Sequence, residues 1–110
     1  MTAALDAGEP VSIKPATVAD GLATPFAGAG ALAVCAERVH RVVLVTDAEI
    51  EDAFRFLYAR AKLACEPAGA ASTAALLAGK VELSAGERVV AVVSGGNAAA
   101  ETASAILAPR

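Results

Sequence analysis

The residues with the clearest chemical potential follow an apolar run near the C-terminus, where Ser94-Gly95-Gly96-Asn97 comes directly after residues 89–93. The β-branched run predicts a buried strand, and the glycine pair predicts a tight turn into a helix. At the carboxyl end of such a strand, glycines let backbone amides approach a ligand, and Ser94 and Asn97 add a hydroxyl and an amide. Most turns of this kind are only tight connections, so the pattern alone is weak evidence of a binding site.

Two carboxylates and one imidazole are the other candidates. Glu66 stands before Pro67 and Gly69 at a helix entrance, where a carboxylate is also favoured simply by the helix dipole. For Asp20 the sequence favours a role in capping a loop over a role as an acid or base. His40 is the only histidine, so a histidine-dependent metal site or a serine–histidine triad would need a second chain.

The clearest element that would position these residues is a helix after Thr46. Thr46 and Glu49 form a capping box, in which a hydroxyl and a carboxylate satisfy free backbone amides. Apolar residues then recur at helical spacing, at Ile50, Phe54, Leu57 and Ala61. We expect Pro67 to stop this helix.

The remaining pattern alternates between strands and helices. A helix is predicted over 30–38, a strand over 42–45, and a helix over 70–78 that Gly79 closes. Residues 84–87 predict a turn into the strand at 89–93. Asn97 predicts the N-cap of a last helix through about residue 107, stopped near Pro109. Strands joined through helices by short connections predict an α/β fold with parallel pairing.

Composition excludes several classes of protein. The chain has 110 residues, and although 56% are apolar, only 4% are aromatic, which predicts a modest core built from small contacts. A net charge of −3 offers no basic surface, so nucleic acid is not an expected partner. The apolar runs are too short to span a membrane, and the N-terminus lacks the pattern of a signal peptide. We therefore expect a cytoplasmic protein.

Four blocks of sequence together resemble one known family. They are T-V-A-D-G-L-A at 17–23, V-T-D-A-E-I at 45–50, K-L-A-C-E-P-A-G-A at 62–70 and V-V-S-G-G-N at 92–97. In this order and at about this spacing, they resemble the threonine dehydratase and serine racemase family, whose members are fold type II pyridoxal-phosphate enzymes. The resemblance covers nearly the whole chain. It implies an α/β fold with a partial open parallel sheet and flanking helices, equivalent to the C-terminal part of such an enzyme.

The resemblance also implies roles for individual residues. Ser94 would hydrogen-bond the pyridine nitrogen of pyridoxal phosphate, and this neutral partner would leave the nitrogen unprotonated and suit β-elimination. Glu66 would lie under the edge of the ring. The implied cofactor-binding residues are Ser94, Gly21, Glu66, Gly95 and Asn97, and the implied substrate-proximal residues are Thr24 and Asp20.

Two family motifs do not occur in this sequence. They are the S-x-K-x-R-G-A motif with the Schiff-base lysine and the G-G-G-G-L type of phosphate loop. Lys62 does not replace that lysine, because the family has a non-catalytic lysine at this point. The acidic metal cluster of some members would fall upstream of Asp6, so no catalytic residue and no metal ligand is predicted here.

The resulting prediction is a single partial domain over residues 1–110. Residues 1–28 would be an irregular lead-in with the cofactor-proximal loop, and residues 29–110 an α/β segment. The parent reaction would convert threonine or serine to a 2-oxo acid and ammonia, and we expect the isolated chain to be inactive. Dehydratase and racemase activities are not distinguished.

Two alternatives remain open. The chain could be a non-catalytic remnant or assembly module that pairs with a separate N-terminal half or forms a homo-oligomer. It could also be an unrelated α/β domain whose S-G-G-N turn binds anions.

Overall fold

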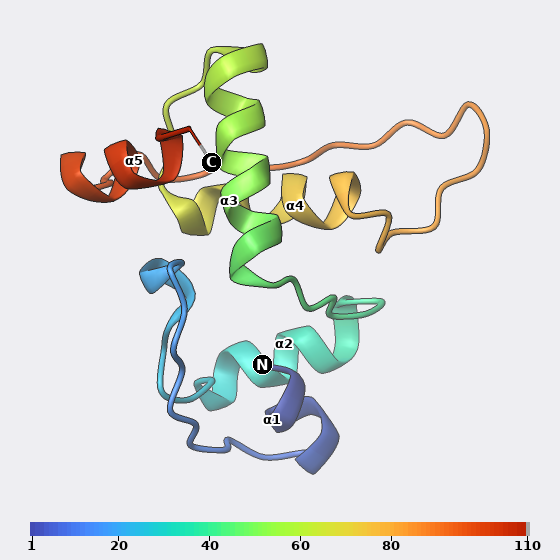
Figure 1. Cartoon of the computed structure of the whole chain (residues 1–110). Helices are drawn as coiled ribbons and strands as arrows, with labels where there is room; N and C mark the ends of the chain where they lie inside the picture. The colour runs from blue at the N-terminus through green and yellow to red at the C-terminus, as the bar shows by residue number, and fades with distance from the viewer. Residues whose placement is uncertain (110) are drawn as a thin grey trace.

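The computed structural model describes residues 1–109 and is built from helices, short helical turns and extended segments (Figure 1). In chain order the helical elements are α1 (Thr2–Ala7), η1 (Asp20–Leu22), α2 (Ala29–Arg38), α3 (Asp47–Phe56), η2 (Leu57–Ala61), η3 (Pro67–Ala70), α4 (Ala71–Leu77) and α5 (Ala100–Leu107). Helix α3 occupies the middle and contacts α4, η3 and α5, whereas α1 and α2 pack on each other at one end (Figure 1).

The predicted capping box starts α3. The Thr46 hydroxyl accepts a hydrogen bond from Glu49 N at 3.3 Å, and Glu49 Oε2 accepts one from Thr46 N at 2.7 Å. The predicted apolar stripe faces the core at Ile50, Phe54 and Leu57. These observations confirm the prediction of the helix start and of its buried face.

The end of this helix differs from the prediction in two ways. After α3 the chain continues as the wider turn η2 and stops at Lys62, which adopts the left-handed conformation with φ 58°. The helix therefore ends before Pro67, and Ala61, which the pattern placed on the buried stripe, is exposed. The widened last turn rotates Ala61 off the stripe, because a π turn does not keep the 3.6-residue period.

Removing the cap is expected to destabilise the centre of the fold. Thr46→Ala leaves an amide of the first turn without its acceptor, so the free energy of unfolding should fall by about 1 kcal/mol. Urea unfolding followed by circular dichroism measures the change. Ser12→Ala, in an exposed extended segment, is the matched control and should leave the transition unchanged. Equal losses in both variants would contradict this account of the cap.

Lys80 ties the capping box to two neighbouring segments. Its Nζ donates to Glu49 Oε2 at 2.7 Å and to the carbonyl oxygen of Leu44 at 3.0 Å. The hydrogen bond from Lys80 is the main cause that holds the pKa of Glu49 below its ordinary value, and the hydrogen bond from Thr46 N adds to it. The end of α4 is thereby fastened to the start of α3.

This ion pair predicts a dependence of stability on pH. Because the pKa of Glu49 is lowered in the folded state, its contribution is present above the ordinary value of 4.5 and is lost as the pH falls below it. We expect the urea concentration at the unfolding midpoint to decrease as the pH is lowered from about 6 to about 3. The decrease should be smaller in Lys80→Met. Lys14→Met serves as the control for loss of one positive charge. Parallel pH profiles for the wild type and Lys80→Met would refute the assignment.

The N-terminal part contains one predicted and one unpredicted helix. Helix α2 confirms the prediction for residues 30–38, with Leu32 buried. The prediction of an irregular lead-in within residues 1–28 is wrong for α1. This six-residue helix buries Ala4 and ends at Gly8 with φ 72°. A helix this short is stabilised by packing, here on α2, rather than by a stripe that its sequence could show.

The C-terminal helices agree with prediction at α4 and depart from it at α5. Gly79 closes α4 with φ 65°, and its N–H donates to Leu76 O at 3.1 Å, as expected of a helix-ending glycine. Helix α5 ends at Leu107, before Pro109. Its N-cap is Ala99 rather than Asn97, so the prediction of Asn97 as the cap is wrong. The turn predicted at 84–87 is present, closed by Glu87 N donating to Ser84 O at 3.0 Å.

The prediction of a parallel sheet is not supported, because none of residues 1–109 lies in a strand. Residues 42–45 and 89–93 are extended, but two of their carbonyl groups meet side chains of the α4 region instead of a neighbouring strand. The Leu44 carbonyl accepts from Lys80 Nζ, and the Val92 carbonyl accepts from Ser72 Oγ at 2.7 Å. Val90 is 87% and Val92 is 68% exposed, so these two residues of the run face outward, whereas Val93 packs against the core. The segment predicted over 29–110 as α/β is thus helical and extended in its described part, and residue 110 lies outside that part.

The molecule has more surface than a self-contained domain of its size. Its accessible area is 7458 Å², against about 5,600 Å² for a folded monomer of this mass. Its radius of gyration is 15.0 Å, against about 13 Å for a compact domain of this length. The buried core is correspondingly small and lies around α3, formed by Ala19, Ile50, Ala53, Phe54, Leu57, Cys65, Ala70, Ala74 and Ile106.

No helix among residues 1–109 is long and apolar enough to cross a membrane.

Candidate functional site

Three segments that are far apart in sequence meet beside the core. They are the Asp20–Gly21 turn in η1, residues 66–69 at η3, and residues 94–97. Turn η1 contacts η3, and Glu66 N donates a hydrogen bond to Gly95 O at 3.2 Å. The structure therefore brings together three of the four sequence blocks.

The glycines in these segments allow backbone and side chain to approach closely. A Cβ atom at Gly69 would lie 1.9 Å from the carbonyl oxygen of Ser94. One at Gly95, where φ is +74°, would lie 2.4 Å from Glu66 Oε1. One at Gly21 would lie 3.1 Å from the same oxygen. Glycine at position 69 is therefore required to seat the S-G-G-N turn on the E-P-A-G turn, and the Glu66 carboxylate lies between Gly21 and Gly95.

A cavity of about 350 Å³ opens at this junction. Its polar lining consists of the carboxylates of Asp20 and Glu66, the amide of Asn97 and the hydroxyl of Thr102. Among residues 1–109, those that line it include no lysine or arginine. Two carboxylates without a lining cation disfavour an anion, so this wall suits a neutral or cationic polar edge and disfavours a phosphate group.

The other predicted site residues lie outside the cavity lining. Ser94 and Gly95 lie on the exposed surface of the adjoining turn, and Gly21 lies on the opposite turn. Ser94 is held in place through its backbone, which packs on Gly69. Ser94 is therefore three residues from Asn97, which lines the cavity, but Ser94 itself is not part of the lining.

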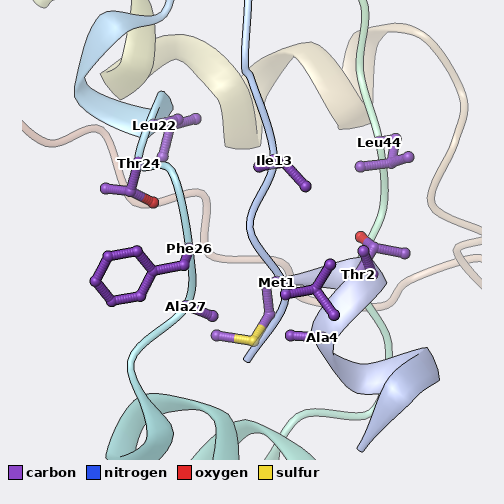
Figure 2. Close-up of a pocket in the computed structure, with 11 residues that line it drawn as sticks. Met1, Thr2, Ala4, Ile13, Leu22, Thr24, Phe26, Ala27 and Leu44 are labelled. Atoms are coloured by element: carbon purple, nitrogen blue, oxygen red, sulfur yellow. The ribbon is translucent and has the colours of Figure 1, made fainter. Parts of the chain in front are cut away.

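Thr24 is not brought to this junction. It lines a separate cavity of about 350 Å³ between α1 and the extended segments, whose walls are mainly apolar. Figure 2 shows Thr24 between Leu22 and Phe26 on one segment, with Ile13 on the middle segment and Leu44 on the far one. Thr24 and Asp20, both predicted to lie near the substrate, therefore line different cavities in this structure.

Sequence reasoning missed two contributions to the site. Gly69 supports Ser94, and the only available signal was its place in the E-P-A-G block. Asp47 binds the segment before the Asp20–Gly21 turn, with Val18 N donating to its Oδ2 at 3.2 Å. That contact joins residues 29 positions apart, and no local pattern could indicate it.

Cys65 beside the cavity is not a nucleophile at neutral pH. Burial raises the pKa of its thiol, and the negative charge of Glu66 raises it further. The thiol is therefore protonated and acts as an apolar core group.

Comparison with known proteins gives matches along most of the chain. A family model described as "Pyridoxal-phosphate dependent enzyme" matches residues 1–95. A catabolic L-threonine dehydratase of Staphylococcus aureus strain N315 is 42% identical over 86 residues, which cover 76% of this chain and 25% of that protein. A phenylserine dehydratase of Ralstonia pickettii is 39% identical over 104 residues, which cover 93% of this chain and 32% of that protein. The chain thus spans between a quarter and a third of the length of these relatives.

Solved structures agree with these matches. A threonine deaminase of T.th. superposes with a TM-score of 0.74 at 31% identity, covering 88% of this chain and 35% of that chain. Serine racemase from Dictyostelium discoideum gives a TM-score of 0.72 at 31% identity, covering 88% and 31%. The predicted resemblance to threonine dehydratase and serine racemase is confirmed. With residues 1–95 matching its model, the chain belongs to the pyridoxal-phosphate-dependent enzyme family, and this membership implies pyridoxal phosphate as the cofactor.

Proposed function

We propose that this chain forms the wall facing the cofactor ring in a cytoplasmic pyridoxal-phosphate-dependent dehydratase, which converts a 3-hydroxy amino acid to a 2-oxo acid and ammonia. One observation carries the proposal: the Asp20–Gly21, Glu66–Gly69 and Ser94–Asn97 segments meet around one cavity. The activity of the whole enzyme belongs to the proposal, because the chain spans 25% and 32% of the two dehydratases it matches.

The residues at this junction fit one side of the cofactor. A pyridine ring offers a nitrogen and a hydroxyl at its edges, and the junction offers the exposed Ser94 hydroxyl, the Asn97 amide and a fixed Glu66 carboxylate. The glycines at 21 and 95 leave the close approach to Glu66 free of side chains. The cavity lining is acidic and would repel the phosphate group. The fit is therefore to the ring and not to the phosphate.

In the proposed site the chain orients and does not transfer protons. The Ser94 hydroxyl would hydrogen-bond the ring nitrogen, and Glu66, anchored through its own N–H to Gly95 O, would hold the edge of the ring. When bound, pyridoxal phosphate supplies the electron sink that stabilises negative charge at the substrate Cα. A neutral partner such as Ser94 would leave the ring nitrogen unprotonated and so would moderate that sink.

The lysines of this chain do not suit the role of the Schiff-base amine. The Lys80 amine donates hydrogen bonds to Leu44 O and Glu49 Oε2. It is thus held at the start of α3 and does not line the cavity at the junction. Lys62 and Lys14 are exposed, and neither lines the cavity at the junction. We propose that the proton-transferring lysine belongs to another part of the complete enzyme.

The substrate class follows from the relatives by their names. A threonine dehydratase and a phenylserine dehydratase share the 3-hydroxy amino acid and differ in the group at the β-carbon. We therefore propose the class and leave the choice of threonine or serine open. Racemisation is the second activity to test, because a serine racemase shares the fold.

The ring wall is tested by titrating the chain with two fragments of the cofactor. Pyridoxine presents the ring without the phosphate, and inorganic phosphate presents the anion without the ring. Two-dimensional NMR should show pyridoxine moving the amide signals of Gly21, Gly95 and Asn97, and phosphate leaving them in place. Shifts caused by phosphate at these amides would instead support an anion-binding turn, and no response to pyridoxine would refute the ring wall.

The expected inactivity of the chain has its own test. The chain is incubated with pyridoxal phosphate, reduced with borohydride and analysed by intact mass, and 2-oxo acid is assayed with threonine and with serine. We expect neither an adduct confined to one lysine nor turnover. A single modified lysine together with dehydratase turnover would overturn this part of the proposal.

A second candidate function is assembly with another polypeptide or another copy of the chain. The accessible area of 7458 Å² and the exposed Val90 and Val92 favour it, because monomers rarely leave such surface uncovered. Light scattering of the purified chain, alone and after coexpression with a polypeptide that carries an S-x-K-x-R-G-A motif, tests it. A monomer that ignores this polypeptide would exclude it. Reading the DNA upstream of Met1 for that motif is the simplest companion observation.

A further inference from the structure

Asp47 connects the first turn of α3 to the chain that precedes the Asp20–Gly21 turn. Its Oδ1 accepts a hydrogen bond from the Thr17 hydroxyl, and its Oδ2 accepts one from Val18 N at 3.2 Å. The capping box of α3 is made by Thr46 and Glu49 and does not need the Asp47 side chain. Both carboxylate oxygens are thus engaged by a segment 29 and 30 positions earlier.

The hydrogen bonds continue from Thr17 into the turn. Thr17 Oγ1 also accepts from Ala19 N at 3.1 Å, and Ala19 O accepts from Leu22 N at 2.9 Å, which closes η1. Ala19 is 1% exposed and belongs to the core. A continuous series of bonds therefore leads from the Asp47 carboxylate to the turn that carries Gly21.

The far side of the same turn meets η3. A Cβ atom at Gly21 would lie 3.0 Å from Ala68 Cβ and 3.1 Å from Glu66 Oε1. Gly21 has no side chain that could fix the turn, so its distance from Glu66 depends on how the turn is held from behind. The hydrogen bonds of Asp47 hold Thr17 and Val18, which come just before the turn.

We propose that Asp47 is a positioning residue, which sets the Asp20–Gly21 turn against Glu66 by way of Thr17. The inference rests on the proposed function in one respect, namely that this turn and Glu66 form the ring wall. The geometry favours the role, since both oxygens of this one side chain accept hydrogen bonds from adjacent residues of the segment that leads into the turn.

Two substitutions interrupt the series at different points. Asp47→Asn keeps the size of the side chain but replaces one acceptor oxygen by an amide that only donates. Thr17→Val removes the hydroxyl and keeps the shape. In the chain without cofactor, both should speed the hydrogen exchange of the Leu22 and Ala23 amides about tenfold, as expected for loss of a charge-assisted hydrogen bond. NMR measures the exchange at each residue.

Matched variants separate positioning from general stability. Thr17→Ser restores the hydroxyl and should behave like the wild type. Asp52→Asn removes a carboxylate farther along α3, where Asp52 pairs with Arg55 at 3.0 Å, and should leave η1 unchanged. Unchanged exchange at Leu22 and Ala23 in both Asp47→Asn and Thr17→Val would overturn the proposal, as would an equal rise across α4.

The pyridoxine titration distinguishes this inference from the function on which it rests. If Asp47→Asn raises the exchange of η1 and also abolishes the pyridoxine shifts seen in the wild type, both are supported. If the exchange rises but the wild-type chain shows no pyridoxine shift, the ring wall is refuted while the positioning of the turn stands. If the pyridoxine shifts survive in Asp47→Asn at wild-type strength, the role of Asp47 in the ring wall is refuted.

Discussion

Gly69→Ala is expected to separate the Ser94 turn from η3 and to cause the largest loss of stability of any small substitution in the chain. The added Cβ would lie 1.9 Å from the carbonyl oxygen of Ser94 and 3.0 Å from its carbonyl carbon. Both are backbone atoms, so no side chain can rotate to make room and the segment around Ser94 must move. Overpacking of this kind costs about 1–3 kcal/mol, and contact with backbone places the expected loss at the upper end of that range.

Urea unfolding gives the loss of stability, and NMR shows where the chain moves. The hydrogen bond from Glu66 N to Gly95 O, at 3.2 Å, should weaken, so the Glu66 amide should exchange faster. Gly30→Ala in α2 is the matched control, because a Cβ there meets nothing within 4 Å. Alanine is the better helix former, so this control should gain about 0.5–1 kcal/mol. A stable Gly69→Ala with an unchanged Ser94 segment would show that the close approach is wrong.

Gly95→Ala is expected to displace the Glu66 carboxylate and abolish the response to pyridoxine. Its Cβ would lie 2.4 Å from Glu66 Oε1 and 2.5 Å from Glu66 Cδ. These atoms end a flexible side chain, so the carboxylate can swing away instead of forcing the backbone apart. The left-handed conformation, with φ +74°, adds about 1–2 kcal/mol for any residue with a Cβ.

Gly79→Ala separates these two effects. Gly79 has nearly the same φ, at +65°, but a Cβ there meets nothing within 4 Å. Both variants should therefore lose about 1–2 kcal/mol, while only Gly95→Ala should lose the pyridoxine shifts. The side-chain carboxyl signal of Glu66 should move in the first and stay in the second. Loss of the pyridoxine response in Gly79→Ala would attribute the effect to stability alone.

Features fixed by neighbouring residues were predictable from the sequence. The capping box of α3 needs only Thr46 and Glu49, three positions apart, and the turn at 84–87 and the end of α4 at Gly79 are equally local. Each of these depends on backbone groups that lie within one helical turn of the residue that satisfies them. Local chemistry therefore determines them whatever the rest of the fold does.

Features that depend on distant partners were predicted less well. The β-branched run at 89–93 has the composition of a strand, but a strand also needs a neighbour, and its Val92 carbonyl bonds Ser72 instead. Helix α1 forms because it packs on α2, which its own sequence does not reveal. Asn97 has a good capping side chain, yet α5 begins at Ala100, and Asn97 lines the cavity instead.

The candidate site shows the same division. The four sequence blocks predicted that Gly21, Glu66 and Gly95 belong together, and the close approaches among them agree with this. Their roles toward the cofactor stay predictions. Thr24 follows the Asp20–Gly21 turn closely in sequence but lines another cavity, because the chain runs away from the junction after η1. Two residues close in sequence thus line different cavities.

The extended segment that carries Val90 and Val92 also affects how readily the molecule would aggregate or be cleaved by proteases. Its apolar side chains are 87% and 68% exposed, and its backbone is not part of any sheet within residues 1–109. An unpaired apolar segment is a template for pairing between copies as concentration rises, and it offers a protease an accessible stretch of chain. A partner that covers this segment would therefore protect the protein from both aggregation and proteolysis. The half-life of the protein in the presence of a protease would show whether the segment is covered.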